Sequence, residues 1–247
     1  KQAVIELSKR SVSIRFDDWM DERDAAEALW FHHFIHAKDW LVQAIEDWMA
    51  SVKSDPILSK DQLIPVYGKV GIITFAVQAV EDYACTGYAY LEALDNGVER
   101  IYEYVRDFGK RLKNRKTGTV GEFFKRVLSN DQALYELTGF QPSSSDFTST
   151  RNHLQSVYEF YKKYRLLYLK FKHGQAFIPL ILQSKTEEKP AVYIIPDKIE
   201  REHGTVRLPS QGHLIPLDEW ELAKDITVRI NTYFLQIRSL SRKLFSV

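Results

Sequence analysis

The sequence predicts an all-α protein: a single antiparallel bundle of about five long helices, with a small β-hairpin inserted before the last helix. Three observations support this fold class. Large apolar residues recur at steps of three and four over several long segments, as on an amphipathic helix. Glycine and proline, which break helices, number only 11 and 8 among 247 residues. Four of the eight prolines fall between residues 190 and 216, where this period is lost.

The N-terminal third is predicted to hold one strand and two long helices. The segment VSIRF at 12–16 alternates apolar and polar residues, as a short strand does. A first helix is expected from about residue 17 or 18 to 53, and a second from about 69 to 95. Small residues at Ala84 and Gly87 would let a neighbouring helix approach the second one closely. The apolar face of the first helix is Trp30, Phe34, Ala37, Leu41, Ile45, Trp48 and Val52, and that of the second is Ile73, Val77, Val80, Ala84, Gly87, Leu91 and Leu94.

The remaining helices follow the same period. A third helix is expected from residue 101, and a capping box, TVGE at 119–122, precedes shorter helices. Residues 141–150 (QPSSSDFTST) are predicted to be a linker. A fourth long helix then starts near Thr150, and either ends at Gly174 or continues to a kink at Pro179. Its apolar face is Leu154, Val157, Tyr161, Tyr164, Tyr168 and Phe171, and that of the last helix is Ile226, Ile230, Tyr233, Ile237, Leu240 and Leu244.

Residues 186–216 are predicted to form the β-hairpin insertion. AVYIIP and TVRLP resemble two short strands on either side of EHG. All the apolar helix faces must be buried, and one shared core would bury them together. We therefore expect residues 1–247 to form a single helical domain that contains this insertion.

Composition excludes several classes of function. The net charge is +1, so an electrostatic argument for nucleic-acid binding must rest on local patches. The single cysteine, Cys85, excludes an internal disulfide and a cysteine-rich zinc site. The longest apolar runs, VGIITFAVQAV and AFIPLIL, are far short of the ~20 residues that span a bilayer. No nucleotide-binding glycine loop is present. We expect a cytoplasmic protein without membrane contact and without a cofactor.

The segment YKKYRLLYLKFKHG at 161–174 is the strongest candidate for a functional helix. On a helix, Arg165 and His173 are roughly 80° apart around the axis and about 12 Å apart along it. Lys172 shares a line with Arg165, and Tyr168 lies on the apolar face between them. Two cations without a base bind phosphate but do not transfer protons. Histidine before glycine is also an ordinary helix end, because His⁺ suits the dipole and Gly174 the left-handed cap.

This helix, together with the helix count, resembles the HEPN superfamily of helical bundles. Many HEPN proteins are RNases of toxin and defence systems, and they carry an Arg-x(4–6)-His motif on a late core helix. The resemblance implies that Arg165 would hold phosphate and His173 would move a proton, without a metal. Here seven residues separate the two. A binding or scaffold protein is therefore the leading hypothesis, and a divergent HEPN-like ribonuclease is the alternative.

Two further sets of residues are candidates for binding. The segment RDFGKRLKNRK at 106–116 is the most basic in the chain, and it would suit RNA or an acidic protein partner. Glu81, Tyr88 and Glu92 line one border of the second long helix. They would meet Arg165 and Lys172 if the two helices are neighbours, either as plain ion pairs or as a polar pocket. The basic candidates are Lys110, Arg111, Lys113, Arg115 and Lys116.

A histidine-rich stretch, WFHHFIHAKDW, has the spacing of a metal site. His32, His36 and Asp39 would share one face of a continuous helix. That face lies opposite the predicted apolar stripe, so we expect a solvated polar surface and no metal. A third hypothesis is a homo-oligomerisation module, which would leave an apolar stripe exposed after the bundle closes.

Overall fold

The computed structural model describes most of the chain. For residues 3–8, 11–16, 200–202 and 205–207, and for residues 29, 32, 33 and 59, the description covers the backbone alone. The segments outside the described residues are 1–2, 9–10, 17–20, 34–37, 56, 62, 114–118, 173–176, 184–187, 196–199, 203–204, 208–211 and 247.

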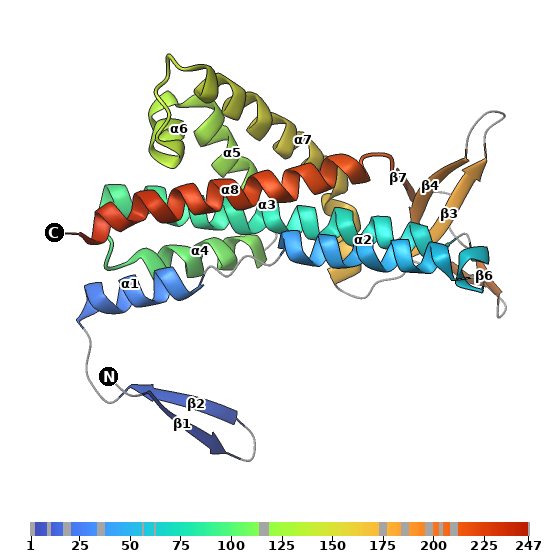
Figure 1. Cartoon of the computed structure of the whole chain (residues 1–247), viewed down its shortest axis with the longest axis horizontal. Coiled ribbons are helices and arrows are strands. Elements are labelled where there is room, and N and C mark those ends of the chain that lie inside the picture. The colour runs from blue at the N-terminus through green and yellow to red at the C-terminus, as the bar shows by residue number, and fades with distance from the viewer. Residues whose placement is uncertain are drawn as a thin grey trace.

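The described residues are mostly helical, as the sequence predicts (Figure 1). Three helices are long, with 33, 28 and 26 residues, and the others have 17 or fewer. The coarse fold class is therefore confirmed, but a bundle of about five long helices is not. The helices are α1 (Glu22–His33), α2 (Lys38–Ser54), η1 (Leu58–Lys60), α3 (Ile64–Asn96), α4 (Ile101–Lys113), α5 (Thr119–Ser129), α6 (Asp131–Thr138), α7 (Ser145–Lys172) and α8 (Trp220–Phe245).

The helix α3 is the centre of the fold. It packs against α2, α4, α5, α7 and α8, so it is covered on nearly every side. In Figure 1, α8 and α2 run alongside it, while α5, α6 and the first half of α7 form a further layer. Its predicted apolar face is buried, and so are residues on its other faces, such as Ile72, Ala79 and Tyr83. The amphipathic pattern found the correct face but underestimated how much of α3 is buried.

The predicted first helix is instead two helices, α1 and α2. The buried residues of α2 are Val42, Met49 and Val52, whereas Leu41 and Trp48 are 36% and 44% exposed. The predicted stripe is therefore confirmed at Trp30 and Val52 and wrong at Leu41 and Trp48. It assumed an unbroken helical period through residues 34–37, which lie outside the described part of the chain.

The predicted linker at 141–150 is largely helical, because α7 begins at Ser145. The Ser144 hydroxyl accepts a hydrogen bond from the backbone N–H of Phe147 at 3.1 Å, as a helix cap does. The run of serines therefore starts the helix. Five of the six predicted core residues of α7 are buried, and Phe171 is the exception at 43% exposed.

The inserted region forms more β-structure than predicted. The strands β3 (Phe177–Gln183), β4 (Glu188–Ile194) and β7 (His213–Pro216) make an antiparallel sheet in the order β3-β4-β7, at one end of the helices (Figure 1). The predicted pairing of AVYIIP with TVRLP is wrong: β4 pairs with β3 and β7, and β6 (Thr205–Arg207) pairs with β5 (Glu200–Glu202). At the N-terminus, the predicted strand is β2 (Ser11–Phe16), which pairs with β1 (Ala3–Ser8).

The sheet and the start of α8 are connected to α7 by side chains. The Tyr164 hydroxyl donates a hydrogen bond to the carbonyl oxygen of Pro216 at 3.1 Å. The Lys163 ammonium lies 2.7 Å from a carboxylate oxygen of Glu219, just before α8. These contacts fix the C-terminal half of α7, which carries the candidate site.

The close approach expected at Gly87 is present. A Cβ atom at this position would lie 2.6 Å from Cζ of Phe123 on α5, and the Phe123 ring packs edge-on against Tyr83 and Phe124. On α4, a Cβ at Gly109 would meet nothing within 4 Å.

Gly87→Ala and Gly109→Ala should therefore change stability in opposite directions. Alanine favours a helix over glycine by about 1 kcal/mol at either site. At position 87, overpacking against the confined Phe123 ring costs about 1–3 kcal/mol, so the net effect should be destabilising. The urea midpoints of the two variants, measured by circular dichroism, test both expectations. A higher midpoint for Gly87→Ala would show that α5 does not approach α3 this closely.

Candidate functional site

A buried carboxylate, Glu81, lies at the contact between α3 and α7. Its side chain is 6% exposed, and the Tyr161 hydroxyl donates a hydrogen bond to its Oε1 at 3.1 Å. Burial raises the pKa of Glu81, and the neighbouring Asp82 adds to this effect. Tyr161, Lys172 and Arg165 oppose it by stabilising the charged form. Glu81 therefore holds a proton more readily than an exposed glutamate.

Two phenols of α7 enclose this carboxylate. Tyr161 and Tyr168 are seven residues apart, so they lie on one line of the helix, and both are buried. Of the two, Tyr161 is the one hydrogen-bonded to Glu81. Burial raises the pKa of both tyrosines, and the Glu81 charge raises it further. Both phenols therefore remain protonated, and Tyr161 can donate to the carboxylate.

Two cations of α7, Arg165 and Lys172, stabilise the charged form of the same carboxylate. Arg165 is half-buried, and its Nε atom is buried with no hydrogen-bond partner among the described residues. Lys172 is exposed, with its ammonium 5.5 Å from the centre of the Tyr168 ring. Both act on Glu81 through their charge. The sequence predicted that these two cations share one side of the helix. In the structure, Glu81 is the carboxylate of α3 on which both of them act.

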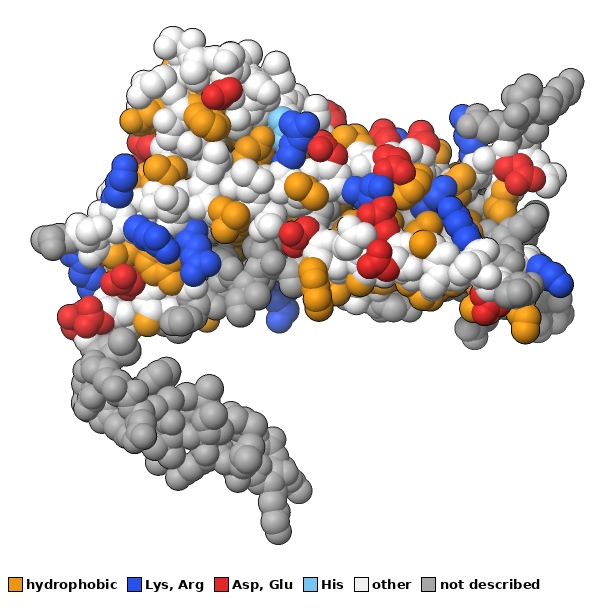
Figure 2. All heavy atoms as spheres, in the orientation of Figure 1, with side chains coloured by type: hydrophobic (Ala, Val, Ile, Leu, Met, Phe, Trp, Pro, Cys, Tyr) orange, Lys and Arg blue, Asp and Glu red, His pale blue; other side chains and the backbone are white. Residues whose placement is uncertain are grey.

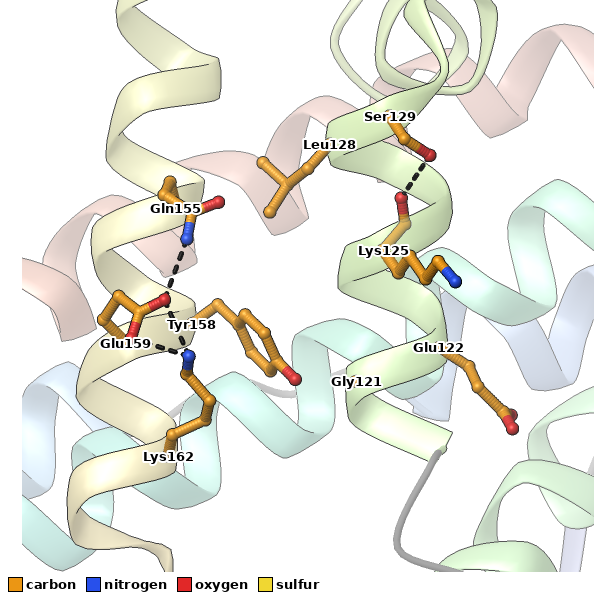
Figure 3. A pocket seen from close by; sticks show the side chains of 9 residues that line it. All are labelled: Gly121, Glu122, Lys125, Leu128, Ser129, Gln155, Tyr158, Glu159 and Lys162. Carbon is orange, nitrogen blue, oxygen red and sulfur yellow. Dashed lines mark hydrogen bonds and ion pairs between the residues drawn. The ribbon is translucent and has the colours of Figure 1, made fainter.

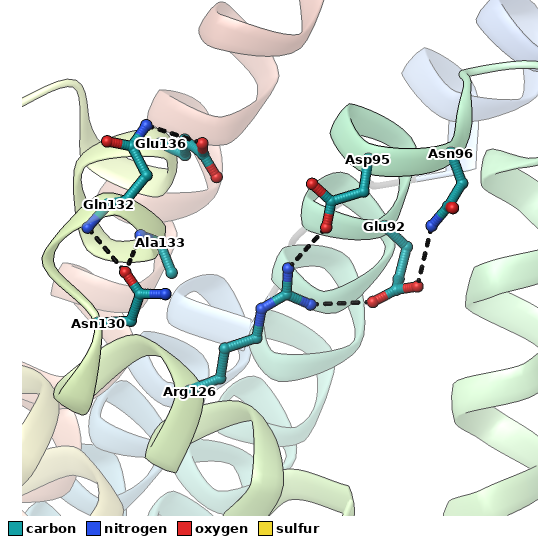
Figure 4. Close-up of polar contacts among 8 residues, drawn as sticks. All are labelled: Glu92, Asp95, Asn96, Arg126, Asn130, Gln132, Ala133 and Glu136. Carbon is teal, nitrogen blue, oxygen red and sulfur yellow. Dashed lines mark hydrogen bonds and ion pairs between the residues drawn. The ribbon is translucent and has the colours of Figure 1, made fainter.

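The other candidates on the same border of α3 have different partners. Arg111 of α4 lies 5.6 Å from the centre of the Tyr88 ring. Arg126 of α5 binds Glu92 at 2.9 Å and Asp95 at 3.0 Å (Figure 4). Of the three predicted residues, only Glu81 therefore meets the α7 cations. Arg126 was missed from sequence because nothing in its local pattern indicates that α5 packs on α3.

The basic segment of α4 is a second cationic surface. Lys110, Arg111 and Lys113 are exposed in the last turn of the helix. Asp107 partly neutralises this end, since it lies 3.9 Å from Lys110 and 3.8 Å from Arg106. The other two predicted cations, Arg115 and Lys116, lie outside the described residues.

The structure does not test the histidine candidates. His173 and His36 lie outside the described residues, as does the side chain of His32. Asp39 accepts a hydrogen bond from Asn231 of α8 at 3.0 Å. Within the described part of the chain, no group of three His, Cys, Asp or Glu side chains is placed to hold a metal ion.

The sequence did not reveal an open groove between α5 and α7 (Figure 3). Its volume is about 650 Å³, and Glu159 on one wall binds both Gln155 and Lys162. Lys162 is one turn from Arg165, so the groove lies next to the Glu81 site along α7. The groove depends on Gly121, where a Cβ would lie 2.8 Å from the Tyr158 hydroxyl. In the sequence, the only indication of this groove was Gly121 itself, which lies inside the predicted capping box.

The face drawn in Figure 2 shows no large area of a single charge among the described residues. In Figure 2, basic and acidic side chains are interspersed over the helices, with apolar side chains between them. On α2, Trp40 is 77% exposed, and Leu41 and Trp48 are also exposed. This is the kind of apolar stripe by which the oligomerisation hypothesis would be recognised.

Together these features define a mostly helical protein with a buried carboxylate beneath two cations. No protein-family model matches the chain, and no curated protein or solved structure matches it. None of the described helices is long and apolar enough to cross a membrane.

A second buried polar group lies between α7 and α8. His153 Nδ1 is 2.9 Å from the Tyr233 hydroxyl, and its Nε2 has no hydrogen-bond partner within the described residues. Burial lowers the pKa of His153 to about 4, and the nearby Arg229 contributes, while Asp225 opposes the shift. The folded protein therefore holds this histidine in its neutral form at neutral pH.

His153 should make the protein less stable in acid. Because the folded pKa is below the unfolded value of about 6.5, its contribution is complete above pH 6.5 and is lost as the pH falls toward 4. The loss should be about 2–3 kcal/mol. Urea midpoints at several pH values should fall less steeply for His153→Gln than for the wild type over this interval. Parallel slopes would mean that folding does not lower the pKa of His153.

Proposed function

We propose that this chain is a cytoplasmic helical binding protein that contacts the phosphate backbone of RNA through Arg165 and Lys172. One structural feature supports the proposal above all. Arg165 is half-buried beside Glu81, and its Nε atom, which is buried, has no hydrogen-bond partner in the described part of the chain, so no carboxylate there already holds this edge of the guanidinium. Most of the other arginines discussed above bind a carboxylate or cover an aromatic ring, so Arg165 is the one best placed to take an external anion.

The chemistry of the two cations suits phosphate. A guanidinium offers parallel N–H donors that match two phosphate oxygens, whereas an ammonium acts as a point charge. Arg165 and Lys172 are seven residues apart, or roughly 10 Å along the helix, so they can contact a nucleic-acid backbone at two points. RNA is chosen because of the HEPN-like outline of the sequence. The exposed cations of α4, Lys110, Arg111 and Lys113, would supply further contacts, as would Arg115 and Lys116.

Arg165→Gln with Lys172→Gln should weaken RNA binding and make it less dependent on salt. Each phosphate contact to a single strand contributes about 0.7 to the slope of log K against log salt, so the slope should fall by about 1.4. Fluorescence anisotropy with labelled single-stranded RNA, from about 50 to 200 mM KCl, measures this. The matched control is Arg100→Gln with Arg229→Gln, which also removes two positive charges, and whose guanidinium groups are already bound to Glu103 and Asp225.

Two results would contradict this proposal. If the control loses as much RNA affinity as Arg165→Gln with Lys172→Gln, the effect is only one of net charge. If polyglutamate competes with the RNA at equal charge concentration, the site binds an acidic protein instead.

The ribonuclease is the second candidate, and Glu81 favours it. A carboxyl group with a raised pKa beside a guanidinium is typical of sites that transfer protons. In this hypothesis Arg165 holds the phosphate, and His173 acts as acid or base in a metal-independent reaction of a toxin or defence system.

Cleavage in EDTA distinguishes the two candidates. The binding hypothesis predicts that structured RNA incubated with the protein and EDTA stays intact on a denaturing gel. The ribonuclease hypothesis predicts cleavage that His173→Ala abolishes and His36→Ala leaves unchanged. Cleavage that both variants retain would point to a contaminating nuclease, and repeated purification would remove it.

A further inference from the structure

We propose that RNA binding at Arg165 and Lys172 is coupled to protonation of Glu81, so that the site binds phosphate more tightly as the pH falls. This inference rests on the proposed function. It adds a regulatory role for a residue that the RNA itself need not touch.

Charged and titratable groups of α7, α3 and α2 surround Glu81. From α7 these are the two phenols, which lie close to the carboxylate, and the two cations, which act through their charge. From α3, Asp82 adds a like charge, and it is paired with Lys38 of α2 at 3.7 Å. The ionised carboxylate is therefore stabilised mainly by α7. The charged and titratable groups are Tyr161, Arg165, Tyr168, Lys172, Asp82 and Lys38.

A bound phosphate would remove much of that stabilisation. It would neutralise Arg165 and Lys172 and bring its own negative charge close to Glu81. Glu81 is 6% exposed, so water could not compensate for the change. Protonation of the carboxylate would then become more favourable.

Coupling of this kind is reciprocal. If phosphate binding raises the affinity of Glu81 for a proton, then a proton on Glu81 raises the affinity of the site for phosphate by the same factor. An ionised Glu81 competes with the phosphate for the two cations, and a protonated one does not. Tyr161 would remain in place in both states, because a phenol can either donate to a carboxylate or accept from a carboxyl group.

Glu81→Gln tests the coupling directly, because glutamine imitates the protonated carboxyl group and does not titrate. The probe is labelled single-stranded RNA, and anisotropy is measured between about pH 5.5 and 8 at constant salt. The wild type should bind more tightly as the pH falls, by at most tenfold per unit because one proton is involved. Glu81→Gln should lack this increase in affinity at low pH. At pH 8 it should bind the RNA about tenfold more tightly than the wild type.

Two controls separate Glu81 from other titrating groups. Glu103→Gln removes an exposed carboxylate that pairs with Arg100, so it should keep the wild-type dependence on pH. Calorimetry in buffers of different ionisation enthalpy counts the protons taken up on binding. The wild type should take up a fraction of a proton that Glu81→Gln does not, whereas the contribution of histidines would be the same in both.

If Glu81→Gln does not fold, as judged by circular dichroism, Tyr161→Phe replaces it. Loss of the hydroxyl donor destabilises the ionised carboxylate, so tight binding should extend to higher pH than in the wild type. Equal pH dependence in the wild type and the folded variant would overturn the coupling and leave RNA binding intact. No RNA binding at any pH would overturn both proposals.

Discussion

The fold depends on the burial of α3. This helix is apolar on nearly all sides, and each fully buried Val, Leu or Ile side chain contributes about 1.5–3 kcal/mol relative to an exposed one. Only a set of helices that surrounds it can remove so much apolar surface from water. α2, α4, α5, α7 and α8 do this together, since each of them packs against α3. The positions of these five helices follow from that requirement.

Glu81 is the main exception within this apolar helix. A buried carboxylate is costly unless hydrogen bonds and opposite charges compensate for it. Here α7 supplies both, through Tyr161 and the two cations near it. The polar group therefore favours one particular alignment of α7 on α3, where apolar contacts alone would tolerate several. Because Glu81 selects this alignment through its contacts with α7, a ligand that binds the same α7 cations would also change the environment of Glu81.

The sequence predicted the helical class because the three-four period is a local property. It failed where the outcome depended on contacts. Leu41 and Trp48 fit the period, yet Val42 and Met49 are buried, because the pattern carries one helical phase into α2 across residues 34–37, which lie outside the described part of the chain. Pro179 suggested a helix kink, but strand β3 contains it. The meeting of Glu81 with Arg165 could be stated only conditionally, since sequence does not determine which helices touch.

The sheet has a physical connection to the site. Tyr164, the residue before Arg165, is hydrogen-bonded to the backbone of Pro216 at the end of β7. Lys163, one residue earlier, is bound to Glu219. Any displacement of the junction between β7 and α8 would thus move the helical turn that bears the guanidinium. None of the described side chains of the inserted region belongs to the cluster, and yet a movement of this region would be passed on to it through the two contacts.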